Sequence, residues 1–308
     1  MNSIIRTEAL VRQFGNVRAV DGVSIDVPPG IVFGFLGPNG AGKTTTIRLL
    51  LGLLEPTAGR AEVFGLDTRA SGAQVREQCG ALLEHTGLYE RLTALDNLEF
   101  YGRVWRMNSG ERLARAKELL ESFGLWERRN DTVSGWSRGM KQKLAVARAL
   151  FHRPKLIFLD EPTAGLDPVA AAALRDDLQT LVSRQGVTVF LTTHNLPEAE
   201  KLCAQVAVIR QGKLLAVGSP QSLRGQENNR VEITGRNINE SALAAVRAYP
   251  DVTGVEQKDS RLTITLLPGA DSAPILTALM QAGVLVDEVH KGRASLEEAF
   301  LDLVEEEK

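Results

Sequence analysis

The architecture follows from Gly37-Pro38-Asn39-Gly40-Ala41-Gly42-Lys43-Thr44-Thr45, which fits the pattern G-x-x-x-x-G-K-S/T. This segment lies between an apolar strand pattern over 31–36 and a helical pattern over 43–54, as the motif requires. Its glycines let backbone N–H groups curl around a β-phosphate, and the following helix N-terminus adds positive potential. Lys43 supplies charge to the β- and γ-phosphates, and the Thr44 hydroxyl is a ligand for Mg²⁺. The segment predicts a nucleoside triphosphate site.

A second apolar segment, Leu156-Ile157-Phe158-Leu159, ends in two carboxylates, Asp160 and Glu161. Ligands bind at the carboxyl ends of parallel strands, so a buried strand over 156–160 brings Asp160 to the metal. Glu161 then lies where it can polarise the attacking water. His194 follows a strand pattern over 188–192 and can reach a γ-phosphate. Solvated acids and a surface histidine are the ordinary alternatives, and the phosphate loop upstream favours the catalytic interpretation.

Strand and helix patterns alternate along most of the chain, which predicts an α/β fold with a largely parallel sheet. The predicted strands span 4–11, 23–27, 31–36, 156–160, 188–192 and 206–210. The predicted helices span 43–54, 110–123, 138–151, 169–184 and 196–202.

The polar, Gly- and Asn-rich segment 225–229 reads as a linker, which predicts domains over 1–224 and 225–308. The second domain shows the order βαββαβ, typical of a ferredoxin-like α+β fold. Its elements are predicted over 231–234, 240–249, 252–257, 262–267, 273–282 and 285–290. A last helix over 295–305 begins with a capping-box pattern, Ser295 and Glu298.

Composition narrows the possible partners. The 308 residues carry a net charge of −2, which does not favour an electrostatic nucleic-acid binder, and we expect no nucleic-acid partner. The two cysteines, Cys79 and Cys203, are too few and too far apart for a disulfide framework or a clustered metal site. No segment approaches the roughly 20 apolar residues that cross a bilayer, and no signal peptide precedes the first strand. Any membrane role is therefore expected to come from a partner.

These motifs, in this order, resemble the nucleotide-binding domain of ABC transporter ATPases over about residues 4–224. The signature is the discriminating match, because other P-loop families lack it. The matching segments are Phe14 (the aromatic that stacks on adenine), 37–45 (Walker A), Trp136-Ser137-Arg138-Gly139-Met140-Lys141-Gln142 (the ABC signature), 156–161 (Walker B and the catalytic glutamate), 164–167 (the D-loop) and His194 (the switch histidine).

Some positions depart from the common pattern. Arg138 replaces the first signature glycine and Met140 replaces the glutamine, whereas Ser137 and Gly139 remain. Glu84 stands where the family usually carries a glutamine near Mg²⁺ and the lytic water. These departures resemble the subfamily of drug-resistance, sodium-extrusion and antibiotic-exporting ATPases, as does the ending Gly292 to Leu301.

The resemblance implies a head-to-tail homodimer that holds two ATP molecules with Mg²⁺, with Ser137 and Gly139 acting across the interface. It implies catalytic roles for Glu161, His194 and Glu84, and metal contacts from Thr44, Asp160 and Glu84. The implied nucleotide contacts are Phe14, Gly37, Pro38, Asn39, Gly40, Ala41, Gly42, Lys43, Thr44 and Thr45.

The resemblance also implies a separate membrane permease, which would place this chain at the cytoplasmic face of the cell membrane, in an exporter. The aromatic-rich segment 88–106 is the expected permease contact, and internal core packing explains its aromatics equally well. Packing against its own sheet is favoured for the helix over 295–305, with a dimer contact or a regulatory brake as alternatives.

Two rival functions fit the sequence less well. A soluble ABC ATPase of translation or DNA repair usually has two such domains or a long coiled coil, and this chain has one Walker A and no long heptad run. A non-enzymatic module with a degenerate site disagrees with the intact Lys43, Asp160, Glu161 and His194. No residue identifies the cargo.

Overall fold

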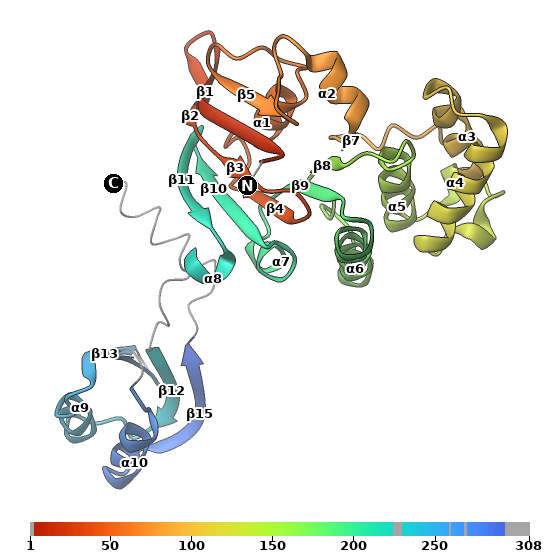
Figure 1. Cartoon of the computed structure of the whole chain (residues 1–308). Helices are drawn as coiled ribbons and strands as arrows, with labels where there is room; N and C mark the ends of the chain where they lie inside the picture. The colour runs from red at the N-terminus through yellow and green to blue at the C-terminus, as the bar shows by residue number, and fades with distance from the viewer. Residues whose placement is uncertain (1–2, 224–229, 259, 268–269, 293–308) are drawn as a thin grey trace. The chain divides into compact units, whose positions relative to one another are not determined.

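The computed structural model describes residues 3–223, 230–258, 260–267 and 270–292, which form two compact units, Met1–Pro220 and Gln221–Lys308 (Figure 1). No helix within these described ranges is both long and apolar enough to cross a membrane.

The first unit is built on a six-stranded sheet in the order β11-β10-β4-β9-β8-β7. All neighbouring pairs are parallel except β10 and β11, which form an antiparallel hairpin at one edge. The strands span Val32–Leu36 (β4), Cys79–Leu82 (β7), Leu156–Asp160 (β8), Thr188–Thr193 (β9), Gln205–Arg210 (β10) and Lys213–Gly218 (β11). The central strands β4, β8 and β9 are buried along their whole length, as expected for strands covered on both faces.

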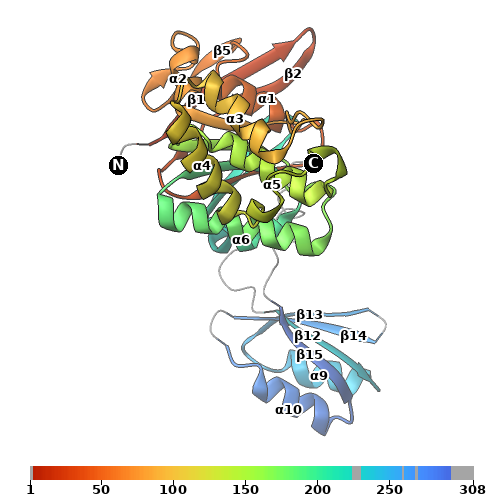
Figure 2. The same cartoon turned by 90° about the vertical axis from the view of Figure 1, so that its right-hand side faces the viewer.

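A second, antiparallel sheet has the order β2-β1-β5-β6, with β3 also paired to β1. Its strands span Ile5–Phe14 (β1), Val17–Val23 (β2), Asp26–Val27 (β3), Ala58–Val63 (β5) and Leu66–Asp67 (β6). Helix α1 (Lys43–Leu50) lies between the two sheets (Figure 2). The buried rings of Phe33, Phe35, Phe158 and Phe190 continue this core.

The remaining helices span Gly72–Gln78 (α2), Ala94–Val104 (α3), Ser109–Ser122 (α4), Arg138–Ala149 (α5), Pro168–Gln185 (α6), Leu196–Leu202 (α7) and Pro220–Leu223 (α8), with short 3₁₀ turns at Trp126–Arg128 and Val133–Gly135. Helices α6 and α7 lie along the other face of the parallel sheet, and α3, α4 and α5 lie toward and beyond its β7 edge (Figure 1). Helix α2 lies on the same side as α1, and α8 follows the end of β11.

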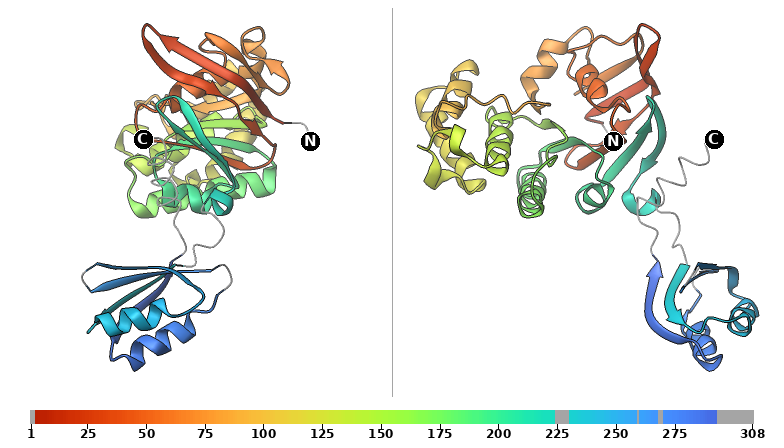
Figure 3. Two further views of the ribbon diagram at one scale, coloured as in Figure 1. Left: turned by 90° about the vertical axis from the view of Figure 1, so that its left-hand side faces the viewer. Right: turned by 180° about the vertical axis from the view of Figure 1, so that it is seen from behind.

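The second unit carries its own core under an antiparallel sheet in the order β13-β14-β12-β15, with both helices on one face (Figure 3). Its elements are Arg230–Arg236 (β12), Glu240–Arg247 (α9), Val252–Lys258 (β13), Arg261–Leu266 (β14), Ala273–Gln281 (α10) and Leu285–Gly292 (β15). The predicted order βαββαβ is confirmed. The helix predicted over 295–305 and the linker predicted over 225–229 lie outside the described residues.

Several sequence predictions are wrong. The predicted strand over 23–27 contains only the last residue of β2 and the short β3, because at Ser24 and Ile25 the hydroxyls of Ser24 and Thr7 accept backbone N–H groups in place of ladder bonds. The helix predicted over 43–54 ends at Leu50, just before the left-handed Gly52. The antiparallel sheet was not predicted as a separate layer, and β5, β6, β7, β11, α2 and α3 were missed. Strand β5 lacks a clear apolar pattern, because it contains the charged residues Arg60 and Glu62.

Candidate nucleotide-binding site

The phosphate loop joins β4 to α1 and is shaped by two glycines. Gly40 and Gly42 have φ values of +80° and +104°, a left-handed conformation that favours glycine. A side chain at Gly42 would place its Cβ 2.1 Å from the carbonyl oxygen of Ala19 on β2. The loop therefore packs directly against the backbone of β2, and only glycine fits at this contact.

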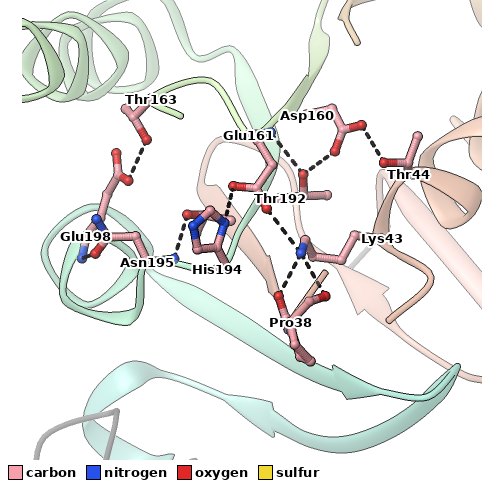
Figure 4. A network of polar contacts seen from close by, with 12 residues as sticks. Pro38, Lys43, Thr44, Asp160, Glu161, Thr163, Thr192, His194, Asn195 and Glu198 are labelled. Carbon is pink, nitrogen blue, oxygen red and sulfur yellow. Dashed lines mark hydrogen bonds and ion pairs between the residues drawn. The ribbon is translucent and has the colours of Figure 1, made fainter. Parts of the chain in front are cut away.

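Lys43, the first residue of α1, is only 6% exposed, and its Nζ group is fixed by three oxygen contacts (Figure 4). Nζ donates to the carbonyl of Gly37 at 2.6 Å and to that of Pro38 at 3.1 Å. It also forms an ion pair with Oε1 of Glu161 at 3.1 Å. The ammonium group is thus held at the loop, next to the carboxylate predicted to act as base.

Asp160, at the carboxyl end of β8, is 7% exposed and accepts hydrogen bonds on both carboxylate oxygens (Figure 4). The Thr44 hydroxyl donates to Oδ2 at 2.6 Å, and the Thr192 hydroxyl donates to Oδ1 at 2.5 Å. Thr192 lies directly opposite Asp160 in the β8–β9 pairing. This contact was not predicted from the sequence, although the threonines that follow the apolar run Val189 to Leu191 were a usable signal.

Glu161 connects Lys43 to His194. Its Oε2 lies 2.9 Å from Nδ1 of His194, and its backbone N–H donates to the hydroxyl and the carbonyl of Thr192, both at 3.1 Å. Glu161 has a φ of +50°, a left-handed conformation that is uncommon for residues other than glycine. Such backbone strain clusters at functional sites, where the surrounding structure holds it.

A cavity of about 370 Å³ joins most of these groups. It is lined by Ala19, Asn39, Gly40, Ala41, Gly42, Lys43, Thr44, Thr45, Leu83, Glu84, Thr86, Arg138, Gln142, Asp160, Glu161 and Ala164. The sequence did not single out Ala19, Leu83 or Thr86, and it placed Arg138 and Gln142 in the signature and Ala164 in the D-loop without bringing them to this cavity. Their contribution depends on how distant segments meet in space.

Of the other residues with predicted roles, Glu84 lines this cavity, whereas Phe14, Gly37, Pro38, Ser137, Gly139 and His194 are not part of its lining. Phe14 ends β1 with 44% exposure, and the Arg12 guanidinium lies 4.4 Å from its ring centroid. Ser137 caps α5 by accepting a hydrogen bond from the backbone N–H of Met140, and Gly139 lies in the first turn of that helix. Glu84 lines the cavity and forms an exposed ion pair with Arg48 at 3.4 Å. Gly37 and Pro38 contribute the carbonyls that hold Lys43.

A second contact connects the loop after Glu161 to the helix after His194 (Figure 4). The Thr163 hydroxyl donates to Oε2 of Glu198 at 2.6 Å, and Asn195 caps α7 by accepting from the Glu198 backbone N–H. Glu198 is only 4% exposed, and burial raises the pKa of its carboxyl. This hydrogen bond was not predicted from the sequence, because only the fold brings Thr163 and Glu198 together.

The aromatic segment 88–106 divides between surface and interior. Tyr89 and Phe100 are 48% and 40% exposed, and their ring centroids lie 4.9 Å apart. Trp105 instead stacks on His152 with ring centroids 3.9 Å apart. The buried Asn97 holds this surface in place, because its side chain bonds the backbone N–H and carbonyl of Tyr89. Tyr89 and Phe100 therefore form an exposed aromatic pair on a fixed backbone.

Comparisons with known proteins agree with this fold and site. Residues 20–164 match the ABC transporter family, and residues 218–304 match the C-terminal domain of DrrA1-3-like ATP-binding proteins. The daunorubicin resistance ATP-binding protein DrrA3 of Streptomyces coeruleorubidus is 37% identical over 98% of this chain and 96% of its own length. The bacitracin transport ATP-binding protein BcrA of Bacillus licheniformis is 33% identical over 99% and 98%, respectively. The ABC transporter ATP-binding protein NatA of Bacillus subtilis is 41% identical over 69% and 87%.

Solved structures resemble the first unit. The cbiO1 protein of Clostridium perfringens, part of the ABC transporter complex cbiONQ, has a TM-score of 0.68 at 25% identity, covering 72% of this chain and 91% of its own. The ATP-binding cassette MJ0796, described as a dimer in a post-hydrolysis state with ADP and Pi, has a TM-score of 0.62 at 25% identity, covering 70% and 98%.

The phosphate loop, the paired carboxylates and the cassette fold define an ABC ATPase. The chain belongs to the ATP-binding subunits of ABC transporters, in the drug-resistance export subfamily that includes DrrA, BcrA and NatA. It is the ATP-binding subunit of an exporter of this type, as the sequence predicted.

Proposed function

We propose that this chain holds ATP with Mg²⁺ in the cavity at the phosphate loop and hydrolyses it as a head-to-tail homodimer. Closing of the dimer then drives a separate permease at the cytoplasmic face of the membrane. One observation carries the proposal: Lys43, the adjacent Asp160 and Glu161, and His194 come from three segments of the chain and meet around a single phosphate loop. Such a meeting of cation, metal ligand and base is what phosphoryl transfer to water requires.

The residues present fit Mg²⁺. The Thr44 hydroxyl and the Asp160 carboxylate are hard oxygen donors 2.6 Å apart beside the phosphate loop. No group of three or more His, Cys, Asp or Glu side chains suited to a metal occurs in the described part of the chain, in keeping with an ion held largely by phosphates and water. When bound, Mg²⁺ neutralises charge on the β- and γ-phosphates. Glu84, which lines the cavity, is proposed to lie close to that ion.

Each side chain then has a defined task. Asn39, Gly40, Ala41, Gly42, Thr44 and Thr45 present backbone and hydroxyl groups to the phosphates, and Lys43 supplies charge. Glu161 accepts a proton from the attacking water, and His194, hydrogen bonded to it, steadies the transferring phosphoryl group. Gly37 and Pro38 hold Lys43 in place through their carbonyls.

The homodimer proposal rests on the signature residues. Ser137 and Gly139 lie at the N-terminus of α5 and outside the cavity lining of their own chain, so they are available to a nucleotide held by a second copy. A helix N-terminus carries unpaired backbone N–H groups that favour a phosphate. Phe14, at the exposed end of β1, is proposed to stack on adenine after Arg12 moves aside.

The permease is proposed to dock on the exposed pair Tyr89 and Phe100. Aromatic residues are enriched at protein interfaces, and the Asn97 side chain holds the backbone of this surface. The names of relatives point to resistance against compounds such as daunorubicin, and we propose an organic toxic compound as cargo. Selectivity for that compound belongs to the permease.

The second unit is proposed to be a ferredoxin-like domain beginning near residue 225. Its element order and its sheet order β13-β14-β12-β15 support that assignment. Because it has its own core, we expect a chain truncated after Leu223 to keep its affinity for ATP. A large loss of ATP binding in that truncated chain would contradict the proposed boundary.

The first experiment is to tag the chain in its native cell, solubilise membranes gently and identify the proteins that co-purify. A stoichiometric partner with several membrane-spanning helices is the expected result, with ATPase activity that Glu161→Gln abolishes. Recovery with ribosomes or DNA-repair proteins instead would overturn the transport assignment.

A further inference from the structure

Arg138 stands out in the nucleotide cavity because it comes from the signature helix and not from the phosphate loop. It is the first residue of α5, directly after the N-cap Ser137. Its side chain is exposed and lines the same cavity as Lys43 and Thr44. Gln142, four residues further along α5, lines that cavity too. Residues four apart share one face of a helix, so this face of α5 is turned toward the nucleotide site of its own chain.

The guanidinium of Arg138 lies against Gly165 in the loop that follows Glu161. If Gly165 carried a side chain, its Cβ would come within 2.3 Å of Nη1 and 2.5 Å of Cζ of Arg138. Gly165 also has a left-handed φ of +70°. Its bare backbone therefore leaves room for the guanidinium beside Ala164, which itself lines the cavity.

Arg138 has unused hydrogen-bond donors. Within residues 3–223, 230–258, 260–267 and 270–292, no hydrogen bond or ion pair involves its guanidinium. The other charged groups of the cavity are partnered: Lys43 pairs with Glu161, Glu84 with Arg48, and Asp160 accepts from two threonines. A positive group with free donors thus faces a site built for a polyphosphate.

We propose that Arg138 binds the γ-phosphate of the ATP held by its own subunit, in addition to the contacts that Ser137 and Gly139 make across the dimer. The proposal rests on the proposed ATPase function. A guanidinium is planar, always charged, and presents paired donors that match two phosphate oxygens. Since ADP lacks a γ-phosphate, Arg138 acts as a specificity residue that favours ATP over ADP.

The first test compares ATP and ADP binding to the full chain carrying Glu161→Gln, which prevents turnover, with and without Arg138→Gln. Loss of a charge-assisted phosphate contact weakens ATP binding by about tenfold or more, while the affinity for ADP changes by less than about twofold. Arg138→Lys, which keeps the charge, recovers part of the loss. Arg184→Gln on α6, also exposed and away from the cavity lining, serves as the matched control and leaves both affinities unchanged.

A structural role alone would weaken ATP and ADP binding together or lower the unfolding temperature, and either result would overturn the proposal, as would an unchanged ATP affinity. Failure of the proposed function looks different: the chain without any substitution at residue 138 would then bind neither nucleotide.

Mixed dimers separate a contact within the subunit from one across the interface. One copy carries Lys43→Ala and keeps Arg138, and the other keeps Lys43 and carries Arg138→Gln. The only intact phosphate loop then lacks Arg138 in its own chain, and we expect weak ATP retention. When Lys43→Ala and Arg138→Gln are placed in the same copy, the intact loop keeps its own arginine and ATP retention recovers. The reverse order of retention would assign Arg138 to the partner's nucleotide and overturn the proposal.

Discussion

The ammonium group of Lys43 lies 3.1 Å from Oε1 of Glu161, so the phosphate-loop cation and the proposed general base form an ion pair. Lys43 is buried and Glu161 is largely shielded, which strengthens their attraction relative to a surface pair. We therefore expect an arriving γ-phosphate to compete with Glu161 for Lys43 and to leave the carboxylate free to act on water.

Glu161→Gln is expected to abolish hydrolysis while preserving ATP binding. Loss of a general base lowers turnover by about 10²- to 10⁴-fold. The neutral amide no longer competes for Lys43, so ATP affinity stays the same or rises. Lys43→Ala, in contrast, removes the charge and should abolish ATP binding. Turnover is measured by phosphate release, and affinity by equilibrium binding of ATP. Weaker ATP binding in Glu161→Gln would contradict the competition.

Thr192→Val should impair the metal site without touching the nucleotide. The hydroxyl of Thr192 donates to Asp160 and accepts from the backbone N–H of Glu161, so its loss leaves both groups short of a partner. The expected cost is about 1–3 kcal/mol in the free energy of unfolding, with a higher Mg²⁺ requirement for hydrolysis. Thr192→Ser keeps the hydroxyl and is the matched control. Equal behaviour of the two variants in urea unfolding and Mg²⁺ titration would argue against this role.

Glu198→Ala is expected to loosen the loop that carries Thr163. That loop follows the proposed base, and the buried Glu198 carboxylate accepts its hydrogen bond at 2.6 Å. An unpaired Thr163 hydroxyl lowers the free energy of unfolding by about 1–3 kcal/mol, and the ATPase rate should fall with it. Glu198→Gln retains a hydrogen-bond acceptor for Thr163 and removes the carboxyl whose pKa is raised by burial. Its free energy of unfolding and its ATPase rate should therefore be closer to those of the original protein. Identical losses in both variants would contradict the argument.

His152 is expected to make stability fall on acidification. Burial lowers the pKa of His152 from 6.5 to about 4, and its Nε2 lies 3.1 Å from the carbonyl of Cys79. Below pH 6.5 the His152 imidazole is therefore protonated in the unfolded chain, whereas in the folded chain it stays neutral down to about pH 4. The contribution of the neutral imidazole is complete above pH 6.5 and is lost as pH falls toward 4.

Urea unfolding at pH 7.5 and pH 5 measures this loss. His152→Gln keeps a side-chain amide that can donate to the Cys79 carbonyl but does not titrate, so its stability should change less between the two pH values. A pH dependence equal to that of the original chain would rule out His152 as the cause.

The sequence predicted the family of this protein better than the layers of its fold. The motif at 37–45 and the strand ending at Asp160 were sufficient to indicate a nucleoside triphosphate site, because their spacing and apolar flanks are local features. The strand over 156–160 and the helix over 196–202 were predicted with their observed bounds. The antiparallel sheet was missed because β5 is rich in exposed charge and glycine, and its pairing with β1 joins segments far apart in sequence.

Contacts between distant segments could not be predicted in the same way. Thr192 is adjacent to Asp160 only through the register of β8 and β9, and Thr163 meets Glu198 only after α7 packs beside the loop. Arg138 was noted as a departure from the usual signature, but its place in the cavity depends on how α5 is oriented against the loop containing Gly165. A sequence pattern can indicate that such a residue is important, but it does not indicate which distant residue will contact it.

The contact between Gly42 and the Ala19 carbonyl ties the phosphate loop to the strand that follows Phe14. No side chain fits between the phosphate loop and β2, so the two backbones keep a constant separation. Phe14, the residue proposed to stack on adenine, ends β1 close to the start of β2 at Val17. The spacing between the proposed adenine site and the phosphate loop is thereby set by main chain, so the frame that would receive base and phosphates does not depend on the rotamer of any side chain at this contact.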